Sequence, residues 1–378
     1  MGAIMENLRD RYRAFGEEVQ AIYKDAQSKM GAEDVRYIKR LNWFSRAMEG
    51  VGRGLIHFSF EPVGFSAGVL ALWVHKQLQT TEIGHTVLHG AYDKLEGAER
   101  FRSKGFYWDI PIDEESWRKG HNQDHHQYTN IAGKDPDIHF GFVRLTERTP
   151  HRSTHFWQVP YTLLVAFPNF GMAMNLHFTG MLDYYDGNGL ESEFDFIKDR
   201  SKETRKEVHK KAFRKFIPYY AKEYILFPAL AGPFFWKVML GNFLAEKLRD
   251  VYTAATIYCG HVGEDVADYP EGFRAQSKGH WYAMQVESSN NFRVPKVLSV
   301  LCGGLDMQIE HHMFPKLPPH RLREISADVE AACARHGVAY RKASWPKTLG
   351  RALKRIARLS RASTGGLGQI KAVANGMV

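Results

Sequence analysis

Apolar residues gather in three zones of the chain, at 41–87, 156–182 and 216–261, and strongly charged stretches separate these zones. Within the zones the apolar positions follow a helical rather than an alternating pattern, and strand signals are scarce. We therefore expect an all-α fold. The sequence shows no internal repeat that would indicate an array of small units.

The first zone contains the most continuous apolar run, Pro62–Val74, and its helical pattern continues without a breaker as far as His89. A helix over 62–89 would be about 42 Å long. Because this exceeds a hydrocarbon core of about 30 Å, we expect its last turns to project into water. The segment before Pro62 forms the first half of a hairpin and carries three charges that suit a spanning helix poorly, at Arg46, Glu49 and Arg53.

In the third zone, Gly232 and Pro233 predict a turn, after which a second helix leads to His261. That helix contains the charged side chains Glu246, Lys247, Arg249 and Asp250. Charges at this depth are costly in lipid unless they face protein or a cavity.

Lys and Arg are abundant in the segments that join the apolar zones, and such segments normally stay on the cytoplasmic side. We therefore expect about four transmembrane helices in two hairpins, Leu41–His85 and Phe216–His261, with Phe156–Leu182 at the interface. The predicted units are an N-terminal cytoplasmic amphipathic segment (1–40), a membrane domain (41–345) with a helical cytoplasmic cap, and a basic C-terminal tail (346–378).

The chain carries 51 Lys and Arg against 42 Asp and Glu, a formal net charge of +9. This excess suits an anionic membrane face or an acidic partner protein, and no nucleic-acid motif accompanies it. The N-terminus has no apolar signal-peptide core. The chain has three cysteines, Cys259, Cys302 and Cys333. They form no pair with CxxC spacing, which indicates free thiols.

Seven of the 18 histidines fall into three tight groups. These groups are HTVLH, HNQDHH and QIEHH, and their histidines are His85 and His89, then His121, His125 and His126, then His311 and His312. On a helix, residues four apart share one face, so two imidazoles at that spacing can close on one metal ion. The adjacent histidines point to different sides and can serve a second ion.

Seven imidazoles are too many for one ion and suit two transition-metal ions. Iron, copper and zinc all accept such ligands, although a structural zinc would usually take cysteine as well. The cap is therefore expected to carry a di-metal centre. A single histidine of this kind is more often a surface or core residue than a ligand; the case rests on three groups in one chain.

With these groups, the chain resembles the membrane fatty-acid desaturase superfamily, whose mark is three histidine boxes. The resemblance covers about Val35 to Tyr340 and is nearest to bacterial acyl-CoA desaturases of mycobacterial type and to front-end desaturases. It extends beyond the boxes to EIGHTVLHG, HNQDHHQYTNIAGKDPDI, IYCGHVGED and GGLDMQIEHHMFPKLPPHRL. The haem-binding HPGG motif of a fused cytochrome b5 domain is missing.

The resemblance implies that the seven box histidines are ligands of two Fe²⁺ ions. It also places a ligand between the second and third boxes, which His261 fits and for which His280 competes. Gln308 stands where related desaturases have histidine, and it could bind metal or a water. Among the nearby acids we expect Asp135, Asp137 and Glu310 to accept hydrogen bonds from ligating imidazoles.

The implied activity is O₂-dependent insertion of a double bond into a fatty acyl chain carried by CoA, a lipid or a carrier protein. No flavin or nicotinamide motif is present, so electrons are expected from a ferredoxin or a flavin/iron–sulfur reductase. The expected location is a bacterial cytoplasmic membrane, with the active site on the cytoplasmic side. Two alternatives stay open: a di-iron lipid or carotenoid hydroxylase, and a His-rich membrane protein that binds or transports metal.

Overall fold

The computed structural model describes residues 2–185 and 196–362, and these residues are mainly helical. Their few strands are short. β1 (His139–Phe140) pairs antiparallel with β2 (Val143–Arg144), and β3 (Asn291–Arg293) pairs in parallel with β4 (Lys342–Ser344). Helices therefore determine the architecture, as the apolar pattern predicted.

The chain begins with three long helices, α1 (Gly2–Ser28), α2 (Ala32–Phe58) and α3 (Pro62–Leu78). Shorter helices follow, α4 (Thr86–Leu88), α5 (Glu114–Trp117), α6 (His126–Tyr128), α7 (Gln158–Tyr161), α8 (Phe170–Phe178) and α9 (Met181–Tyr185). The remaining helices are α10 (Lys202–Ala221), α11 (Phe227–Ala229), α12 (Phe235–His261), α13 (Lys278–Glu287), α14 (Lys296–Cys302), α15 (Gln308–Met313), α16 (Pro319–Arg335) and α17 (Trp345–Leu359).

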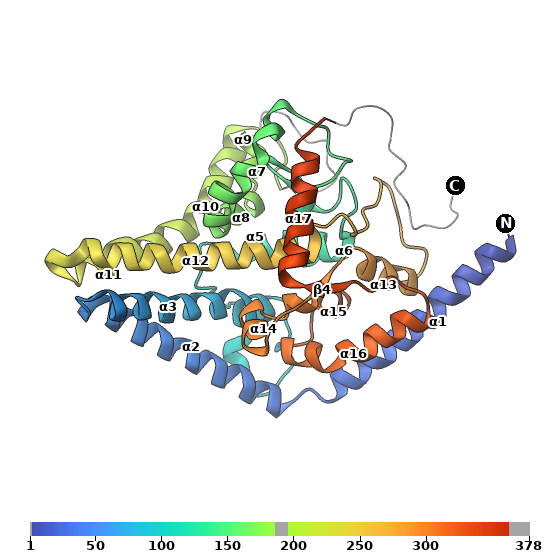
Figure 1. The fold of residues 1–378 in the computed structure, drawn as a ribbon, viewed down its shortest axis with the longest axis horizontal. Helices are drawn as coiled ribbons and strands as arrows, with labels where there is room; N and C mark the ends of the chain where they lie inside the picture. Colours follow the sequence, from blue (N-terminus) through green and yellow to red (C-terminus); the bar gives the residue numbers. More distant parts are fainter. Residues whose placement is uncertain (1, 186–195, 363–378) are drawn as a thin grey trace.

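Helices α2 and α3 form a hairpin, and α12 runs along α3 beside it (Figure 1). Pro62 opens α3 at a position where no backbone N–H is needed. The Glu61 carboxylate caps the helix by accepting hydrogen bonds from the Val63 and Gly64 amides. The two helices of the hairpin touch backbone to backbone at Gly52, where a Cβ would lie 2.6 Å from the Leu72 nitrogen.

Across residues 2–185 and 196–362, the structure has no helix with both the length and the apolar character needed to cross a membrane. The expected arrangement of four transmembrane helices in two hairpins is therefore wrong. The hairpins exist, but α3 has only 17 residues, and the two longer helices are interrupted by charge. These charges are Arg46, Glu49 and Arg53 in the second half of α2, and Lys237, Glu246, Lys247, Arg249 and Asp250 in α12.

Most of these interrupting charges have charged or polar partners within the protein. Glu223, which is fully buried, lies 2.8 Å from the Arg53 guanidinium and 3.0 Å from the Lys76 ammonium. Around them extends a group that we call the ionic network. It consists of Arg46, Glu49, Arg53, His75, Lys76, Asp109, Tyr219, Lys222, Glu223, Glu246, Arg249 and Asp250.

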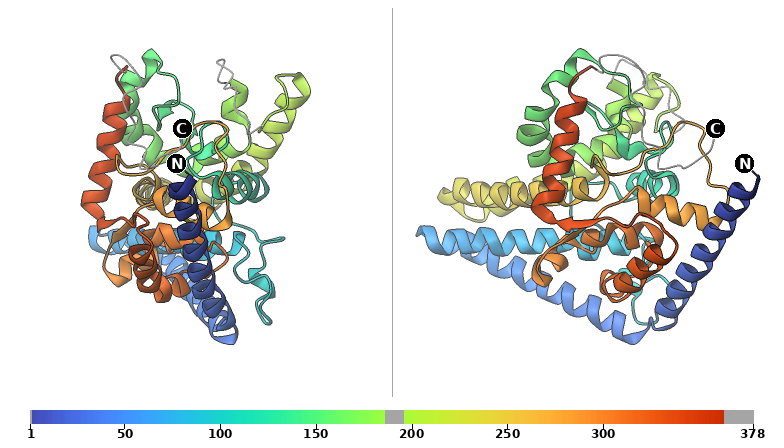
Figure 2. Two further views of the ribbon diagram at one scale, coloured as in Figure 1. Left: turned by 90° about the vertical axis from the view of Figure 1, so that its right-hand side faces the viewer. Right: turned by 45° about the vertical axis from the view of Figure 1, so that its right-hand side comes forward.

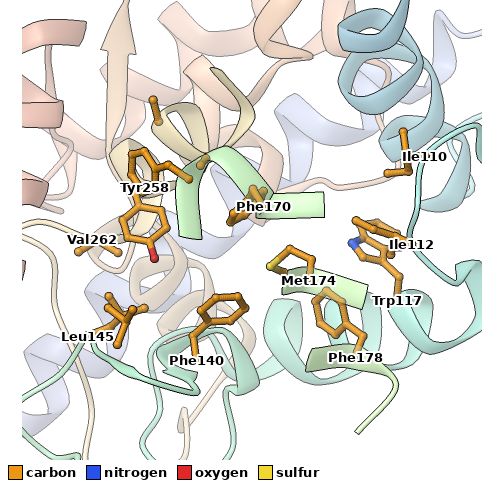
Figure 3. Close-up of a cluster of buried hydrophobic side chains, with 14 of the residues drawn as sticks. Ile110, Ile112, Trp117, Phe140, Leu145, Phe170, Met174, Phe178, Tyr258 and Val262 are labelled. Carbon is orange, nitrogen blue, oxygen red and sulfur yellow. The ribbon is translucent and has the colours of Figure 1, made fainter. Parts of the chain in front are cut away.

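The largest apolar core lies where α8 meets the end of α12 and the loop before α5. Figure 3 shows Phe170, Met174 and Phe178 of α8 facing Trp117 on one side and Tyr258 of α12 on the other. Helix α17 covers part of this core, with Ala352 and Ile356 buried against it. The core thus joins the helical layer around α12 to the upper part of the molecule in Figure 1.

Helix α1 packs against α13 and α16, on the side of the molecule opposite the tip of the α2–α3 hairpin (Figure 2). Its Gly16 meets Gly279 of α13 so closely that a Cβ there would lie 2.7 Å from the Gly279 Cα. The first part of the expected C-terminal tail is the helix α17. Residues 363–378 of that tail lie outside the described residues, and the domain division stays a prediction.

Candidate metal centre

The three histidine groups come from separate parts of the chain and meet in one place. His85 ends a π-helical turn, η1 (Gln79–His85), and His89 follows α4. The second group lies on another π-helical segment, η3 (Arg118–His125), and on α6, while the third group lies on α15. Short π-helical stretches inside α-helices are rare and occur frequently at functional sites.

Four imidazoles form a first group, His85, His89, His121 and His311, whose nearest nitrogens all lie within 4.8 Å of one another. The Nε2 atoms of His85 and His89 are 3.2 Å apart. His85 and His89 therefore share a face, as their spacing predicted. His311 comes from the other end of the chain to complete the group.

A second group consists of His125, His261 and His312, again with nitrogens within 4.8 Å of one another. The Nε2 atoms of His261 and His312 are 3.0 Å apart, and the Gln308 amide nitrogen lies 2.6 Å from the same His261 atom. His311 and His312 thus point to different groups, with their rings nearly perpendicular.

Because His121 and His125 lie on a π-helical segment, their side chains are not aligned as they would be on an α-helix. His121 belongs to the first group and His125 to the second, although the two also lie near each other beside Asp137. His126 lies between the groups, with its Nε2 atom 3.2 Å from that of His121 and its ring stacked on His312. An α-helical i, i+4 pair would have placed both histidines on one ion.

We call these eight histidines together with Gln308 the histidine cluster. Several of its polar atoms are buried without a hydrogen-bond partner. They are Nε2 of His125, Nδ1 of His126, Nδ1 of His261, Oε1 of Gln308 and Nε2 of His311. Orphaned buried polar atoms are rare in proteins and call for a ligand. Neutral imidazole nitrogens gathered in this way fit divalent transition-metal ions.

Burial favours the neutral, metal-binding form of most of these imidazoles. It lowers the pKa of His85 to about 3 and holds the pKa of His311 and His312 well below the ordinary value. His125 differs: burial also works to lower its pKa, but the Asp135 and Asp137 carboxylates raise it to about 9. Carboxylates that stabilise a proton there would equally stabilise a metal cation on the opposite nitrogen.

Of the three acids expected beside the ligands, Asp135 lies within hydrogen-bond distance of an imidazole and Asp137 lies slightly farther away. Asp135 Oδ1 lies 2.9 Å from Nδ1 of His125, and Asp137 Oδ2 lies 3.5 Å and 3.6 Å from Nδ1 of His121 and His125. Glu310 differs from the expectation, because its carboxylate accepts hydrogen bonds from Asn291 and Tyr340 instead of an imidazole. Its side chain therefore anchors α15 to β3.

Sequence reasoning missed two neighbours of His312. Its Nδ1 atom lies 3.1 Å from the Gln285 side-chain oxygen and 3.1 Å from the Thr129 hydroxyl. Thr129 stands four residues after His125 and donates to the carbonyl of that residue, so helical spacing could have indicated it. Gln285 lies on α13, far away in sequence, and no local signal points to it.

The structure separates the two candidates for the additional ligand. His261 lies inside the second group, whereas the His280 ring stacks on Tyr12 with 4.7 Å between ring centres and accepts a hydrogen bond from the Gln276 amide. The geometry therefore favours His261. Its role as a ligand, like that of the seven box histidines and Gln308, stays a prediction.

A narrow internal cavity adjoins the histidine cluster. Its walls include the ligand candidates His85, His121, His261 and Gln308, and then apolar side chains of the core. These are Trp108, Ile110, Ile112, Trp117, Phe170, Met174 and Ile257. On the other side, His89 lines an open cleft of about 1090 Å³ whose rim carries five basic side chains, Lys94, Arg118, Lys119, Lys211 and Lys316.

Comparison with known proteins places these features in a family. The fatty acid desaturase family model matches residues 61–344. The chain belongs to the fatty acid desaturase family. The family resemblance inferred from the histidine boxes is thus confirmed, and the match spans all three boxes.

The similar proteins are desaturases from several kinds of organism. The NADPH-dependent stearoyl-CoA 9-desaturase of Mycobacterium tuberculosis is 31% identical over 348 residues, which cover 91% of this chain and 78% of the relative. The acyl-lipid (8-3)-desaturase of Physcomitrium patens is 28% identical over 269 residues, covering 68% and 52%. The sn-1 linoleoyl-lipid 6-desaturase of Synechocystis is 23% identical over 300 residues, covering 75% and 77%.

This chain is therefore a fatty acyl desaturase, an oxidoreductase of fatty acid metabolism that inserts a double bond into an acyl chain. The hydroxylase and metal-transport alternatives are not favoured. The family implies a metal centre, and the histidine groups are the residues of the described chain that could hold it.

Proposed function

We propose that this desaturase uses two iron ions held by the histidine cluster to desaturate a fatty acyl chain carried by coenzyme A. The observation that carries the proposal is the set of buried, partnerless imidazole nitrogens beside an apolar cavity. The balanced reaction consumes a saturated acyl chain, O₂, two electrons and two protons, and yields the alkene and two waters.

The donor set suits iron. The cluster offers imidazole and carboxamide groups, and none of the three buried cysteines is part of it. When bound, a pair of iron ions supplies the O₂ activation and redox chemistry that removing hydrogen from an unactivated alkyl carbon requires. The first group and the second group would each hold one ion, and Asp135 would orient His125.

The cavity walls perform the protein's own part of the reaction, which is to position the acyl chain and exclude water. Trp117 stacks on His121 with 4.5 Å between ring centres and so lies directly between the ligand candidates and the apolar wall. Met174 and Phe170 form the facing wall. A cavity with apolar walls at this place would hold one carbon pair near the metal centre and limit side reactions.

The basic cleft supports coenzyme A as the carrier. Its rim carries five basic side chains against two acidic ones, Asp93 and Glu115, and the cleft borders His89. Phosphate groups bind readily to such Lys and Arg clusters. The Mycobacterium tuberculosis relative is named for a stearoyl-CoA substrate, and we extend the CoA part of that name to this chain.

We propose a separate protein, a ferredoxin or a flavin/iron–sulfur reductase, as the source of electrons. The basis is the sequence, which has no flavin or nicotinamide motif. The net charge of +9 suits an acidic donor, since complementary charge speeds association.

We also propose that this protein works at the bacterial cytoplasmic membrane, with the histidine cluster on the cytoplasmic side. Large apolar side chains are exposed where the α2–α3 hairpin and the start of α12 project from the molecule (Figure 1). They include Phe58, Phe60, Val63, Leu230, Phe234 and Trp236. Exposed aromatic groups of this kind favour contact with a lipid surface.

The decisive experiment is expression in a host of known lipid composition, followed by mapping of double bonds and metal analysis of the purified protein. We expect a new alkene and two irons per chain. The His125→Ala variant should lose the alkene completely. A hydroxylated product without an alkene, or zinc in place of iron, would contradict the proposal.

The carrier is tested by comparing the same acyl group on CoA, on a carrier protein and in a phospholipid. With stearoyl-CoA we expect turnover, and Lys94→Gln together with Lys316→Gln should raise KM with little change in kcat. An unchanged KM for stearoyl-CoA in this double variant would argue against the basic cleft as the carrier site, and faster turnover of the carrier-protein or phospholipid substrate would argue against coenzyme A.

A further inference from the structure

The internal cavity follows one face of α12 away from the histidine cluster. Four residues of α12 at intervals of four, Arg249, Thr253, Ile257 and His261, all line it. Residues four apart lie above one another on a helix, so these side chains form a single stripe. From residue 249 to residue 261 there are twelve steps, so the stripe is about 18 Å long at about 1.5 Å per step.

The two ends of this stripe differ in chemistry. At one end His261 joins His85 and His121 of the metal centre. At the other end the cavity meets Arg249 and Asp250, which are 1% and 2% exposed. The apolar residues that we assign to the acyl chain lie between these two ends.

The pair at the far end is held firmly. Two guanidinium nitrogens of Arg249 donate to the same Asp250 oxygen at 3.0 Å and 2.7 Å, and a third donates to the Tyr219 hydroxyl at 3.1 Å. The amide of Gly171, which also lines the cavity, donates to that Asp250 oxygen at 3.1 Å. Neither side chain can move without losing several of these bonds.

We propose that the Arg249–Asp250 ion pair is the closed end of the acyl cavity, and that it sets how many carbons of the substrate can lie beyond the metal centre. This inference rests on the assignment of the cavity to the acyl chain. It makes the pair a determinant of chain length, because a methyl end that reaches it has no further apolar wall to contact.

Comparing the gain from burying a methylene with the cost of separating the ion pair predicts a sharp limit on chain length. Each methylene buried in the cavity strengthens binding by about fourfold. Pulling Arg249 from Asp250 would leave buried charges unpaired, which opposes binding by on the order of a thousandfold. One or two extra methylenes therefore cannot displace the pair.

The inference also accounts for charges that α12 carries within an otherwise apolar surrounding. Glu246 approaches the same guanidinium to 3.8 Å and accepts a hydrogen bond from Tyr219. These contacts hold Arg249 from the side away from the cavity. The charges thus face protein and a cavity, which is the condition under which such residues are tolerated.

The test measures equilibrium binding of a homologous series of saturated acyl-CoAs to the metal-free protein by calorimetry, and then the products of the iron-loaded enzyme. For the wild type we expect affinity to rise about fourfold per methylene and then to stop rising at a definite length. The double variant Arg249→Met with Asp250→Asn removes both charges and keeps an acceptor for the Gly171 amide. In this variant, the chain length at which affinity stops rising should shift to longer chains.

A second variant tests the same end in the opposite direction. In Gly171→Ala the added Cβ would lie 3.1 Å from Arg249 Nη2 and 3.2 Å from both Asp250 Oδ1 and Pro111 Cγ. The added methyl group narrows the closed end, so the limit should shift to shorter chains. This variant decides the question if the double variant does not fold.

A control pair is Arg355–Asp268, in which Arg355 is buried and Asp268 is partly buried; the two lie 2.7 Å apart and do not line the cavity. Arg355→Met with Asp268→Asn should reduce stability in a similar way and leave the chain-length limit where the wild type has it. An unchanged limit in both the double variant and Gly171→Ala would overturn the proposal. Failure of the wild type to bind any acyl-CoA would instead contradict the assignment of the cavity and its carrier.

Discussion

The histidine cluster and the ionic network are both buried and polar, yet they differ in how their polar atoms are paired. Five side-chain atoms of the cluster have no hydrogen-bond partner, among them Nε2 of His125 and Nε2 of His311. In the ionic network, Glu223 pairs with both Arg53 and Lys76, and none of the network's fully buried side-chain nitrogens or oxygens lacks a partner. The first arrangement has donor atoms that could bind a metal ion, whereas the second pairs its charges within the protein.

This difference explains why ligand-type residues near one another are not enough to define a metal site. Glu49, His75 and Asp109 lie as close together as the histidines of the cluster do. However, Arg46 lies 3.0 Å from the Glu49 carboxylate and 3.3 Å from that of Asp109, and Lys222 pairs with Asp109 as well. Protein cations already occupy the place that a metal ion would take.

The largest expected effect comes from removing a member of the second histidine group. We expect His261→Ala to reduce bound iron from two ions per chain to about one and to abolish desaturation, because the group then keeps only two imidazoles. Metal analysis and product mapping check this. His280→Ala is the control and should keep both irons; the opposite outcome for the two variants would assign the ligand to His280.

A large loss of stability should follow from breaking the ionic network. Glu223→Gln leaves Arg53 and Lys76 without their shared carboxylate, so the free energy of unfolding should fall by about 3–5 kcal/mol. Equilibrium denaturation measures this change. Glu18→Gln removes a carboxylate from the solvent-exposed pair with Arg335 and should cost under about 1 kcal/mol. Equal losses in the two variants would show that the network is not held by buried charge.

A smaller effect is expected at the edge of the cluster. Asp135→Asn keeps an oxygen for His125 but removes the charge, so iron affinity should fall about 10–100-fold. Competition with a chelator measures it. Asp137→Asn should have a weaker effect, because its oxygen lies 3.5 Å or more from both imidazoles. A stronger effect at Asp137 would reverse the roles assigned to the two acids.

The smallest expected effect tests whether Glu49, His75 and Asp109 of the ionic network bind metal. His75→Gln removes the only imidazole among Glu49, His75 and Asp109, and we expect two irons per chain as in the wild type. Metal analysis after dialysis against excess Fe²⁺ checks this. A lower iron content would mean that ion pairing does not exclude metal from that site.

Much of the site could be predicted from sequence because its parts are local. The spacing of His85 and His89 places them on one face, and adjacent His311 and His312 necessarily diverge. Pro62 and the apolar run after it define the start of α3, and Gly232 with Pro233 marks the turn before α12. The prediction of membrane-spanning helices was wrong. The apolar stretches suggested such spans, but the helices that contain them are too short or too charged to cross a membrane.

What the sequence by itself determined is which residues share a helix face, since helical spacing is a property of the local backbone. Partners across the fold depended on packing. Only the tertiary structure brought His261 rather than His280 to His312, turned Glu310 toward Asn291, and set Gln285 beside His312. It also decided that the charges of α12 meet counter-charges inside the protein, because a side chain's environment is made by whichever helices lie against it.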